Sequence, residues 1–172
     1  MDEIIDIVDE NDQVIGQEEK SKCHKKRLLH RSANIFVFRD SSFRELLLEK
    51  RNSTKGINRS KLCMPGGHLP TKDNYFDGAK RELQEEIFHK HELPKELEFE
   101  KLFKIRKNAD NDHEFTILFR VVTNGPFYLD PAEVESYFFE DIYKLLEKVE
   151  KESENYTETT IFLLKEYQKK FM

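Results

Sequence analysis

Alternation of apolar and polar residues predicts several short strands in the first third of the chain. The strand-like runs are residues 3–8, 13–15, 34–40 and 43–51. Asp40, Ser41 and Ser42 lie between the last two runs and are typical of a hairpin turn. Residues 16–29 are polar and basic and have no clear period, so the pattern predicts no regular element there.

Residues 76–91 have the strongest helical pattern in the chain. Their apolar residues recur at three- and four-residue spacing and form one stripe, made of Phe76, Ala79, Leu83 and Ile87. Asp73 or Asn74 is expected to cap the first turn, and Pro94 is expected to end the segment. The pattern therefore predicts one amphipathic helix that buries this stripe.

The rest of the chain predicts further strands and then two helices. Strand-like runs cover residues 97–106, 113–122 and 133–140, and amphipathic helices cover residues 141–152 and 157–171. Strands mixed with a few helices, without a regular βαβ rhythm, favour an α+β fold with a mixed sheet. At 172 residues and without an internal repeat, the chain is expected to be a single domain. Its peripheral parts are an N-terminal hairpin and connector over 1–29 and a C-terminal helix over 155–172.

Composition and charge restrict the possible partners. The net charge of −5 does not support broad nucleic-acid binding, although local Lys or Arg, or a bound cation, can still hold a phosphate-bearing small molecule. The acidic start lacks the features of a signal peptide, and the apolar runs are too short to span a bilayer. Cys23 and Cys63, the two cysteines, are interpreted as reduced thiols. We therefore expect a cytoplasmic protein with no membrane partner and no extended nucleic-acid partner.

Carboxylates are crowded on the predicted helix at Glu82, Glu85 and Glu86. Helical positions three and four residues apart are neighbours, so these side chains and His89 lie on one face. Charge runs of this kind usually face solvent. Alternatively, the carboxylates bind a hard divalent cation such as Mg²⁺, which prefers oxygen ligands. The helix by itself leaves both interpretations open.

The spacing to an upstream glycine turn favours the cation. Gly67, Asp73 and the segment from Arg81 to Glu86 resemble the Nudix box, G-x5-E-x7-R-E-U-x-E-E-x-G-U, where U is a bulky aliphatic residue. At ~6% usage per residue type, the five identical positions would match by chance about once in a million starting points. The flanking runs 28–51 and 126–145 also look like the branch of the Nudix (MutT-like) superfamily that is near the isopentenyl-diphosphate isomerases.

The box departs from the family pattern at three positions. Asp73 replaces the usual Glu, Phe88 replaces the usual Gly, and His89 takes the final aliphatic position. Asp73 keeps a carboxylate that can brace Arg81 with a shorter side chain. Phe88 removes a flexible helix terminator, so we expect the helix to continue through Lys90 before Pro94 stops it.

The resemblance implies an α/β/α sandwich, in which the box helix covers one side of a mixed sheet and the C-terminal helices cover the other. It implies a diphosphate hydrolase that uses Mg²⁺ (or Mn²⁺) to cleave a nucleoside diphosphate derivative or another organic diphosphate by attack of water on phosphorus. The implied catalytic residues are Arg81, Glu82, Glu85 and Glu86, and the implied metal ligands are Glu82, Glu85, Glu86 and Glu114. The general base stays open between a box glutamate, Glu133 and Glu135.

Substrate-binding residues are expected around the glycine turn. Gly66 and Gly67 allow a close approach of backbone to the diphosphate, and His68 follows them. Arg51, at the end of a strand, is the preferred phosphate-binding cation, whereas we expect Lys55, Arg59 and Lys61 to serve solubility. The loops expected to set specificity, 52–61, 107–113 and 123–132, contain no pattern that names a substrate.

Several histidines support an alternative function. Their positions, with two nearby acids, resemble the metal-site region of the isopentenyl-diphosphate isomerases: His24, His30, His68, Asp112 and Glu114. Those isomerases have a cysteine immediately before the Gly-His pair, where this chain has Gly66, and Cys63 is roughly 10 Å earlier on an extended segment. Their boxes are also degenerate, whereas this box is intact, so hydrolysis is favoured over isomerisation.

Two further alternatives are a non-catalytic Nudix-fold nucleotide-binding module and a homodimer. Binding modules of this kind tend to lose box glutamates, and this chain retains them. The helix after Asn155 either covers the sheet or mediates a dimer. Its apolar stripe, Ile161, Leu164, Tyr167 and Phe171, is more typical of a core.

Overall fold

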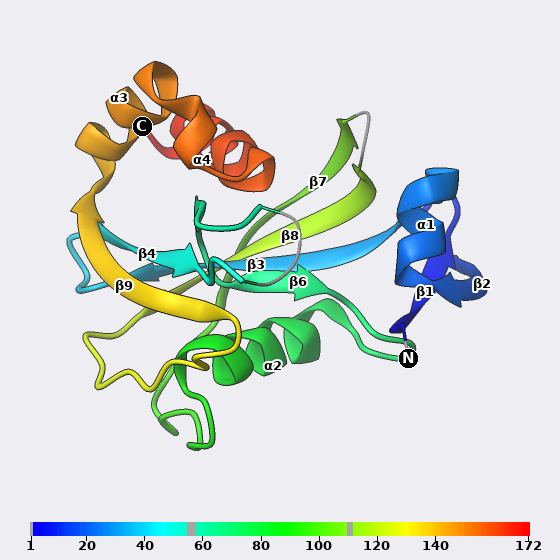
Figure 1. Ribbon diagram of the computed structural model, residues 1–172, viewed down its shortest axis with the longest axis horizontal. Coiled ribbons are helices and arrows are strands. Elements are labelled where there is room, and N and C mark those ends of the chain that lie inside the picture. Colours follow the sequence, from blue (N-terminus) through cyan, green and yellow to red (C-terminus); the bar gives the residue numbers. More distant parts are fainter. Residues whose placement is uncertain (1, 55–57, 110–111) are drawn as a thin grey trace.

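The computed structural model describes residues 2–54, 58–109 and 112–172 (Figure 1). The strands are β1 Ile4–Val8, β2 Val14–Glu19, β3 His30–Phe38, β4 Glu45–Arg51, β5 Leu62–Cys63, β6 Gly66–His68, β7 Glu100–Ala109, β8 Asp112–Val122 and β9 Val134–Asp141. The helices are α1 Lys20–Lys26, α2 Tyr75–Ile87, α3 Ile142–Lys151 and α4 Glu158–Phe171, with a short 3-10 turn at Ser153–Asn155. The predicted strands and helices are therefore present, with boundaries shifted by a few residues.

Within the described residues, seven strands form a mixed central sheet. Its main order is β5-β4-β3-β8-β7, while β6 pairs with β3 and β9 pairs with β4. β3 and β8 are parallel and in register from His30 opposite Glu114 to Phe38 opposite Val122. The other pairs are antiparallel. This parallel pair brings the start of β3 next to the start of β8, far away in the sequence.

Helices cover both faces of this sheet (Figure 1). On one face Phe36, Phe38, Leu46 and Leu48 share a core with residues of α3 and α4. On the other face Ala33, Ile35, Val37 and Leu47 pack against residues of α2. Neighbouring residues of a strand point to opposite faces, which explains why β3 is buried along almost its whole length. The expected α+β sandwich, with the box helix on one side and the C-terminal helices on the other, is confirmed.

α2 begins as the sequence indicates, but it ends earlier. Asn74 caps it by accepting hydrogen bonds from the backbone N–H groups of Phe76 and Asp77. The prediction that the helix continues through Lys90 is wrong, because α2 ends at Ile87. Phe88 is buried against Phe127, and loop backbone takes over the hydrogen bonding there. A buried aromatic side chain therefore ends this helix where the family pattern has glycine.

Two other expectations need correction. α1 and the C-terminal part of β2 form within residues 16–29, for which the polar pattern predicted no element. Phe76 belongs to the predicted apolar stripe but is 44% exposed, with its ring edge on Phe99 and Phe119, whereas Ala79, Leu83 and Ile87 are buried.

The C-terminal helix α4 covers the sheet. Leu163, Leu164 and Tyr167 are buried in the core that α4 shares with β3 and β4, and Ile161 packs against its edge. Phe171, the last residue of the predicted stripe, is exposed. In the parts of the chain that the structure describes, no helix is both long and apolar enough to cross a membrane.

Candidate active site

The glycine turn closes directly onto the box helix at Glu86. The backbone N–H of Gly66, on β6, donates to Glu86 Oε2 over 2.9 Å. Gly66 has a φ of +148°, and a Cβ built on it would lie 2.5 Å from the carbonyl oxygen of Ala33 on β3. Any other residue would force β6 and β3 apart, so glycine is required here for the close strand pairing that positions Glu86.

Gly67 makes room for a second box carboxylate. A Cβ on Gly67 would lie 2.7 Å from each of the three carboxylate atoms of Glu82. The Glu82 side chain is only 13% exposed, because it occupies the space that a side chain at position 67 would fill. The glycine turn therefore lies directly against the box glutamates.

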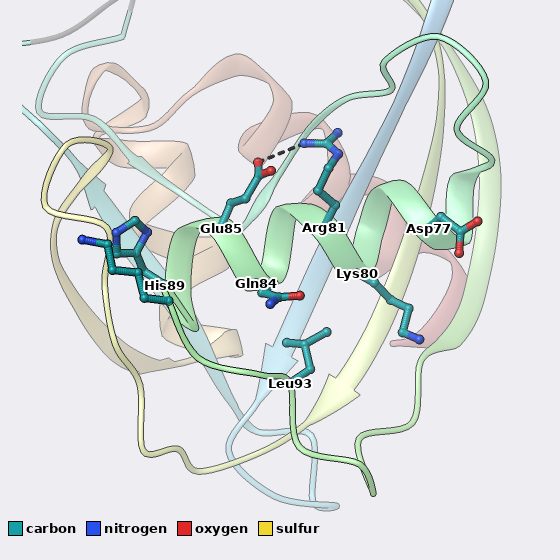
Figure 2. Close-up of a pocket in the computed structure, with 8 residues that line it drawn as sticks. Asp77, Lys80, Arg81, Gln84, Glu85, His89 and Leu93 are labelled. Atoms are coloured by element: carbon teal, nitrogen blue, oxygen red, sulfur yellow. Dashed lines mark hydrogen bonds and ion pairs between the residues drawn. The ribbon is translucent and has the colours of Figure 1, made fainter.

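Arg81 connects these parts. Its Nε donates to Asp73 Oδ2 over 3.3 Å, its Nη1 donates to Glu85 Oε2 over 3.0 Å, and its Nη2 donates to the carbonyl oxygen of His68 over 3.0 Å. Figure 2 shows the Arg81 and Glu85 side chains reaching toward each other along one face of α2. The structure thus has the brace from Asp73 that the sequence predicts, and Arg81 Nη1 also lies 2.8 Å from Glu82 Oε1.

The three box glutamates differ in their exposure to solvent. Glu86 is buried and Glu82 nearly so, whereas the Glu85 side chain is 59% exposed. Glu85 and Arg81 also line a hollow of about 580 Å³ along the outer side of α2, with Lys80, Gln84, His89 and Leu93 (Figure 2). Glu82 and Glu86 therefore form the inner part of the site, and Glu85 is at its rim.

Glu49 joins this inner pair, and sequence reasoning missed it. Glu49 lies on β4 opposite Cys63 of β5 and is 1% exposed. Glu49 and Leu47 are two residues apart on β4, so their side chains point to the same face of the sheet, the face that packs against α2. The signal was available, because an acid at this inward position interrupts a strand that otherwise buries leucines.

Burial makes these carboxylates hard to ionise together. It raises the pKa of Glu49 to about 8, with the charge of Arg51 acting in the opposite direction and that of Glu82 adding to the rise. Burial also raises the pKa of Glu82 to about 7. The pKa of Glu86 is raised well above its ordinary value, first by burial and then by the charges of Glu49 and Glu82. We name Glu49, Glu82 and Glu86 the carboxylate cluster.

The carboxylate cluster fits a hard divalent cation. Its donors are carboxylate oxygens, which Mg²⁺ and Mn²⁺ prefer. The Oε1 atom of Glu49 is buried and has no hydrogen-bond partner within residues 2–54, 58–109 and 112–172. A buried carboxylate oxygen without a partner is costly, and a cation would satisfy it.

Two later acids were candidates for the general base. The backbone of Glu133 lies next to the end of β4, since its carbonyl oxygen accepts from the N–H of Asn52 over 2.9 Å. Glu135 instead bonds Lys50 Nζ over 2.7 Å. The Lys50 side chain points to one face of β4, and the side chains of its neighbours Glu49 and Arg51 point to the other face. The contact with Lys50 therefore counts against Glu135, and the identity of the base stays a prediction.

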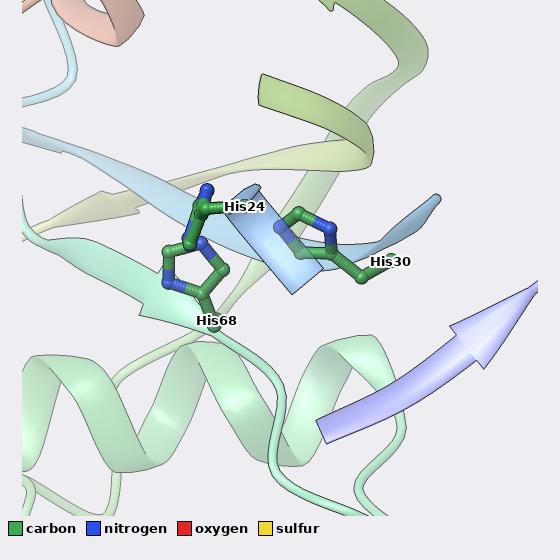
Figure 3. A group of neighbouring side chains, drawn as sticks. All are labelled: His24, His30 and His68. Atoms are coloured by element: carbon green, nitrogen blue, oxygen red, sulfur yellow. The ribbon is translucent and has the colours of Figure 1, made fainter. Parts of the chain in front are cut away.

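A second cluster, which we name the histidine cluster, consists of His24, His30, His68 and Glu114. Figure 3 shows the three rings converging, and one ring nitrogen of each lies within 4.8 Å of the others. Glu114 Oε2 lies 3.8 Å from Nε2 of His30 and 3.8 Å from Nε2 of His68. Glu114, expected with the box glutamates, and His68, expected at the substrate, are therefore brought together here.

The histidine cluster has a buried cation beside it. Lys107 is 2% exposed, its Nζ lies 3.7 Å from Glu114 Oε1, and it donates to Thr159 Oγ1 on α4 over 2.7 Å. The sequence pattern gave no reason to single out Lys107. The side chain of Asp112, also expected here, and the candidate Lys55 lie outside the described residues.

Comparison with known proteins places the chain in a recognised group. A family model described as the NUDIX domain matches residues 28–159. The chain is 30% identical over 171 residues to an isopentenyl-diphosphate Delta-isomerase of Serratia proteamaculans, covering 96% of this chain and 92% of the relative. It is also 30% identical over 140 residues to an uncharacterized Nudix hydrolase of Yersinia pestis, covering 77% of this chain and 70% of the relative. A crystal structure of a Deinococcus radiodurans protein superposes with a TM-score of 0.80 at 20% identity, covering 95% of this chain and 98% of the other, which shows the same fold.

Proposed function

The chain belongs to the Nudix family, and from that premise we propose that it is a metal-dependent hydrolase of an organic diphosphate. The substrate is a nucleoside diphosphate derivative or another organic diphosphate, cleaved by attack of water on phosphorus. The observation that carries the proposal is the packing of the box: Glu82 and Glu86 are enclosed against the glycine turn, and Arg81 is held by Asp73. A solvated helix face would need neither arrangement.

Glu82 and Glu86 would hold the cation, with Glu85 at the rim. Mg²⁺ or Mn²⁺, when bound, neutralises phosphate oxygens and lowers the pKa of a water molecule. Gly66 already donates its N–H to Glu86, so it positions a metal ligand rather than the substrate. Arg51, at the end of β4, carries the positive charge that acts on Glu49 and Glu86, and we expect it to bind a phosphate beside them.

The hollow beside α2 offers a place for the rest of the substrate. It begins at Arg81 and Glu85, the outer residues of the box, and its further lining mixes cations with Gln84 and Leu93 (Figure 2). A polar group attached to the diphosphate would match this mixed lining better than a purely apolar chain.

The test is phosphate release from a panel of nucleotides and organic diphosphates with Mg²⁺, comparing the wild type with Glu86→Gln. Glu147→Gln on α3, whose side chain is 71% exposed and pairs with Lys151, is the matched control. We expect release by the wild type and the control and its loss in Glu86→Gln. If the wild type releases no phosphate from any member of a broad panel, the hydrolase proposal fails and a non-catalytic binding module becomes the better explanation.

An isomerase-like function is the second candidate, and the histidine cluster together with the Serratia relative favours it. The structure gives a reason to rank it lower. No side chain fits at position 66, where the isomerases have cysteine, and Cys63 is instead buried opposite Glu49. Exchange of solvent protons into isopentenyl diphosphate tests this function, and we expect none. Exchange that depends on the histidine cluster would reverse the ranking.

A further inference from the structure

We propose that Glu49 of β4, which lies outside the box, is a ligand of the cation that the box holds. The inference rests on the proposed function, because it concerns the same site. It adds a carboxylate from the central sheet to those of α2. The cation would then join β4 to the box helix as well as to its substrate.

The first argument is position. Register places Glu49 opposite Cys63, and the chain runs from Cys63 through Met64 and Pro65 to Gly66, which donates to Glu86. The charges of both Glu49 and Glu86 act on the Cys63 thiol, and that of Glu82 acts on Glu49. The three carboxylates therefore surround one small region between β4, the glycine turn and α2.

The second argument is the lack of a satisfactory partner. Glu49 is 1% exposed, so water does not solvate it, and its Oε1 has no hydrogen-bond partner among the residues that the structure describes. Arg51 supplies a positive charge, but that charge also acts on Glu86 and Cys63. The guanidinium of Arg81 also lies 2.8 Å from Glu82 Oε1. Three acids beside these two guanidiniums still leave negative charge that a divalent cation would compensate.

A purely structural role would look different. A buried carboxylic acid that only fills space normally donates or accepts a hydrogen bond within the protein. An isosteric glutamine could replace such an acid with little effect on metal binding. A ligand, in contrast, opposes folding when the metal is absent and strengthens metal binding. These two effects have opposite signs, so one variant can reveal both.

The experiment measures Mn²⁺ binding by electron paramagnetic resonance, from the signal of the free ion. All proteins carry His24→Ala, so that the histidine cluster does not add a second site. We expect Glu49→Gln to weaken Mn²⁺ binding by about ten-fold or more. Glu45→Gln, on the same strand but paired with Arg39 and 42% exposed, should bind like its parent. Equal affinity of Glu49→Gln and its parent would overturn the proposal.

A second readout is thermal unfolding of the metal-free proteins at pH 8.5. We expect Glu49→Gln to unfold at a higher temperature than its parent, because it removes a buried charge. The control Glu45→Gln should unfold at the same temperature as the parent. A lower unfolding temperature together with unchanged Mn²⁺ affinity would show a structural role and overturn the proposal. If Glu49→Gln does not fold, Glu49→Asp replaces it: a shortened ligand should weaken Mn²⁺ binding, and unchanged binding refutes the inference.

Glu86→Gln separates this inference from the proposed function. Weaker Mn²⁺ binding in Glu86→Gln with full binding in Glu49→Gln removes Glu49 from the site and leaves the hydrolase proposal standing. If the parent protein binds no Mn²⁺, the metal-dependent function fails, and the role of Glu49 fails with it.

Discussion

The carboxylate cluster and the histidine cluster share one short strand, β6, but differ in chemistry. Gly66 and Gly67 contact Glu86 and Glu82, and the next residue, His68, belongs to the histidine cluster. One cluster offers oxygen donors, which suit Mg²⁺, and the other offers mainly imidazole, which suits Zn²⁺ or Mn²⁺. Three consecutive residues can therefore serve two sites with different ion preferences.

The two clusters also differ in charge balance. In the histidine cluster, Lys107 Nζ lies 3.7 Å from Glu114 Oε1 and balances its charge. The other members of this cluster are histidines, and a histidine side chain carries no negative charge. The carboxylate cluster brings three acids together; the charge of Arg51 acts on Glu49 and Glu86, and Arg81 Nη1 lies 2.8 Å from Glu82 Oε1. The carboxylate cluster consequently has more to gain from a divalent cation. This difference favours the box, not the histidines, as the centre of catalysis.

The strongest test of this ranking is Glu86→Gln. Replacing the most buried box acid should reduce kcat/KM for diphosphate hydrolysis by on the order of 10³-fold, since it removes a donor that fixes the cation. Steady-state phosphate release at saturating Mg²⁺ measures the effect. A loss of less than about ten-fold would mean that Glu86 is not a principal ligand.

The metal-free protein should lose stability as pH rises. Folding raises the pKa of Glu49 from 4.5 to about 8 and that of Glu82 from 4.5 to about 7. Between these values the folded chain retains protons that the unfolded chain has released, so increasing pH favours unfolding. Applied in full, these two shifts lower the free energy of unfolding by roughly 6 kcal/mol between pH 5 and pH 8.5. Urea unfolding in EDTA measures it, and saturating Mg²⁺ should flatten the dependence.

Gly66→Cys would introduce the residue that the isomerases have at this position. Because its Cβ would lie 2.5 Å from the Ala33 carbonyl oxygen and φ is +148°, we expect a destabilisation of about 2 kcal/mol. We also expect no gain of proton exchange into isopentenyl diphosphate. Urea unfolding and exchange measured by NMR check both parts. Stable folding with new exchange activity would show that only one side chain separates this chain from an isomerase.

His24→Ala should have the smallest effect on hydrolysis. It removes one imidazole of the histidine cluster and leaves the box untouched, so Mg²⁺-dependent turnover should change by less than about three-fold, while Zn²⁺ binding should weaken by about ten-fold or more. Turnover and Zn²⁺ affinity, measured on the same preparation, test both expectations. Loss of turnover parallel to loss of Zn²⁺ would make the histidine cluster part of the catalytic centre.

Local sequence predicted those parts of the site that local spacing controls. The box, the cap at Asn74 and the brace from Asp73 to Arg81 all fall within residues 67–89. Lys107 was missed because its burial depends on the contact with α4, which residue patterns do not reveal. The inward position of Glu49 could be read from its strand, but its proximity to the box glutamates depends on the pairing of β4 with β5. The end of α2 was missed because Phe88 meets Phe127, a contact from a distant loop.

The parallel pairing of β3 with β8 constrains how this chain can change length. His30 meets Glu114 only because the two strands align residue for residue. Deleting one residue within either strand would shift the register by one, so that the residues before the deletion, His30 or Glu114 among them, would face the opposite side from those after it. Insertions between the strands leave that alignment intact. We therefore expect length differences among homologues to accumulate in the loops between β3 and β8, while the spacing within each strand stays fixed.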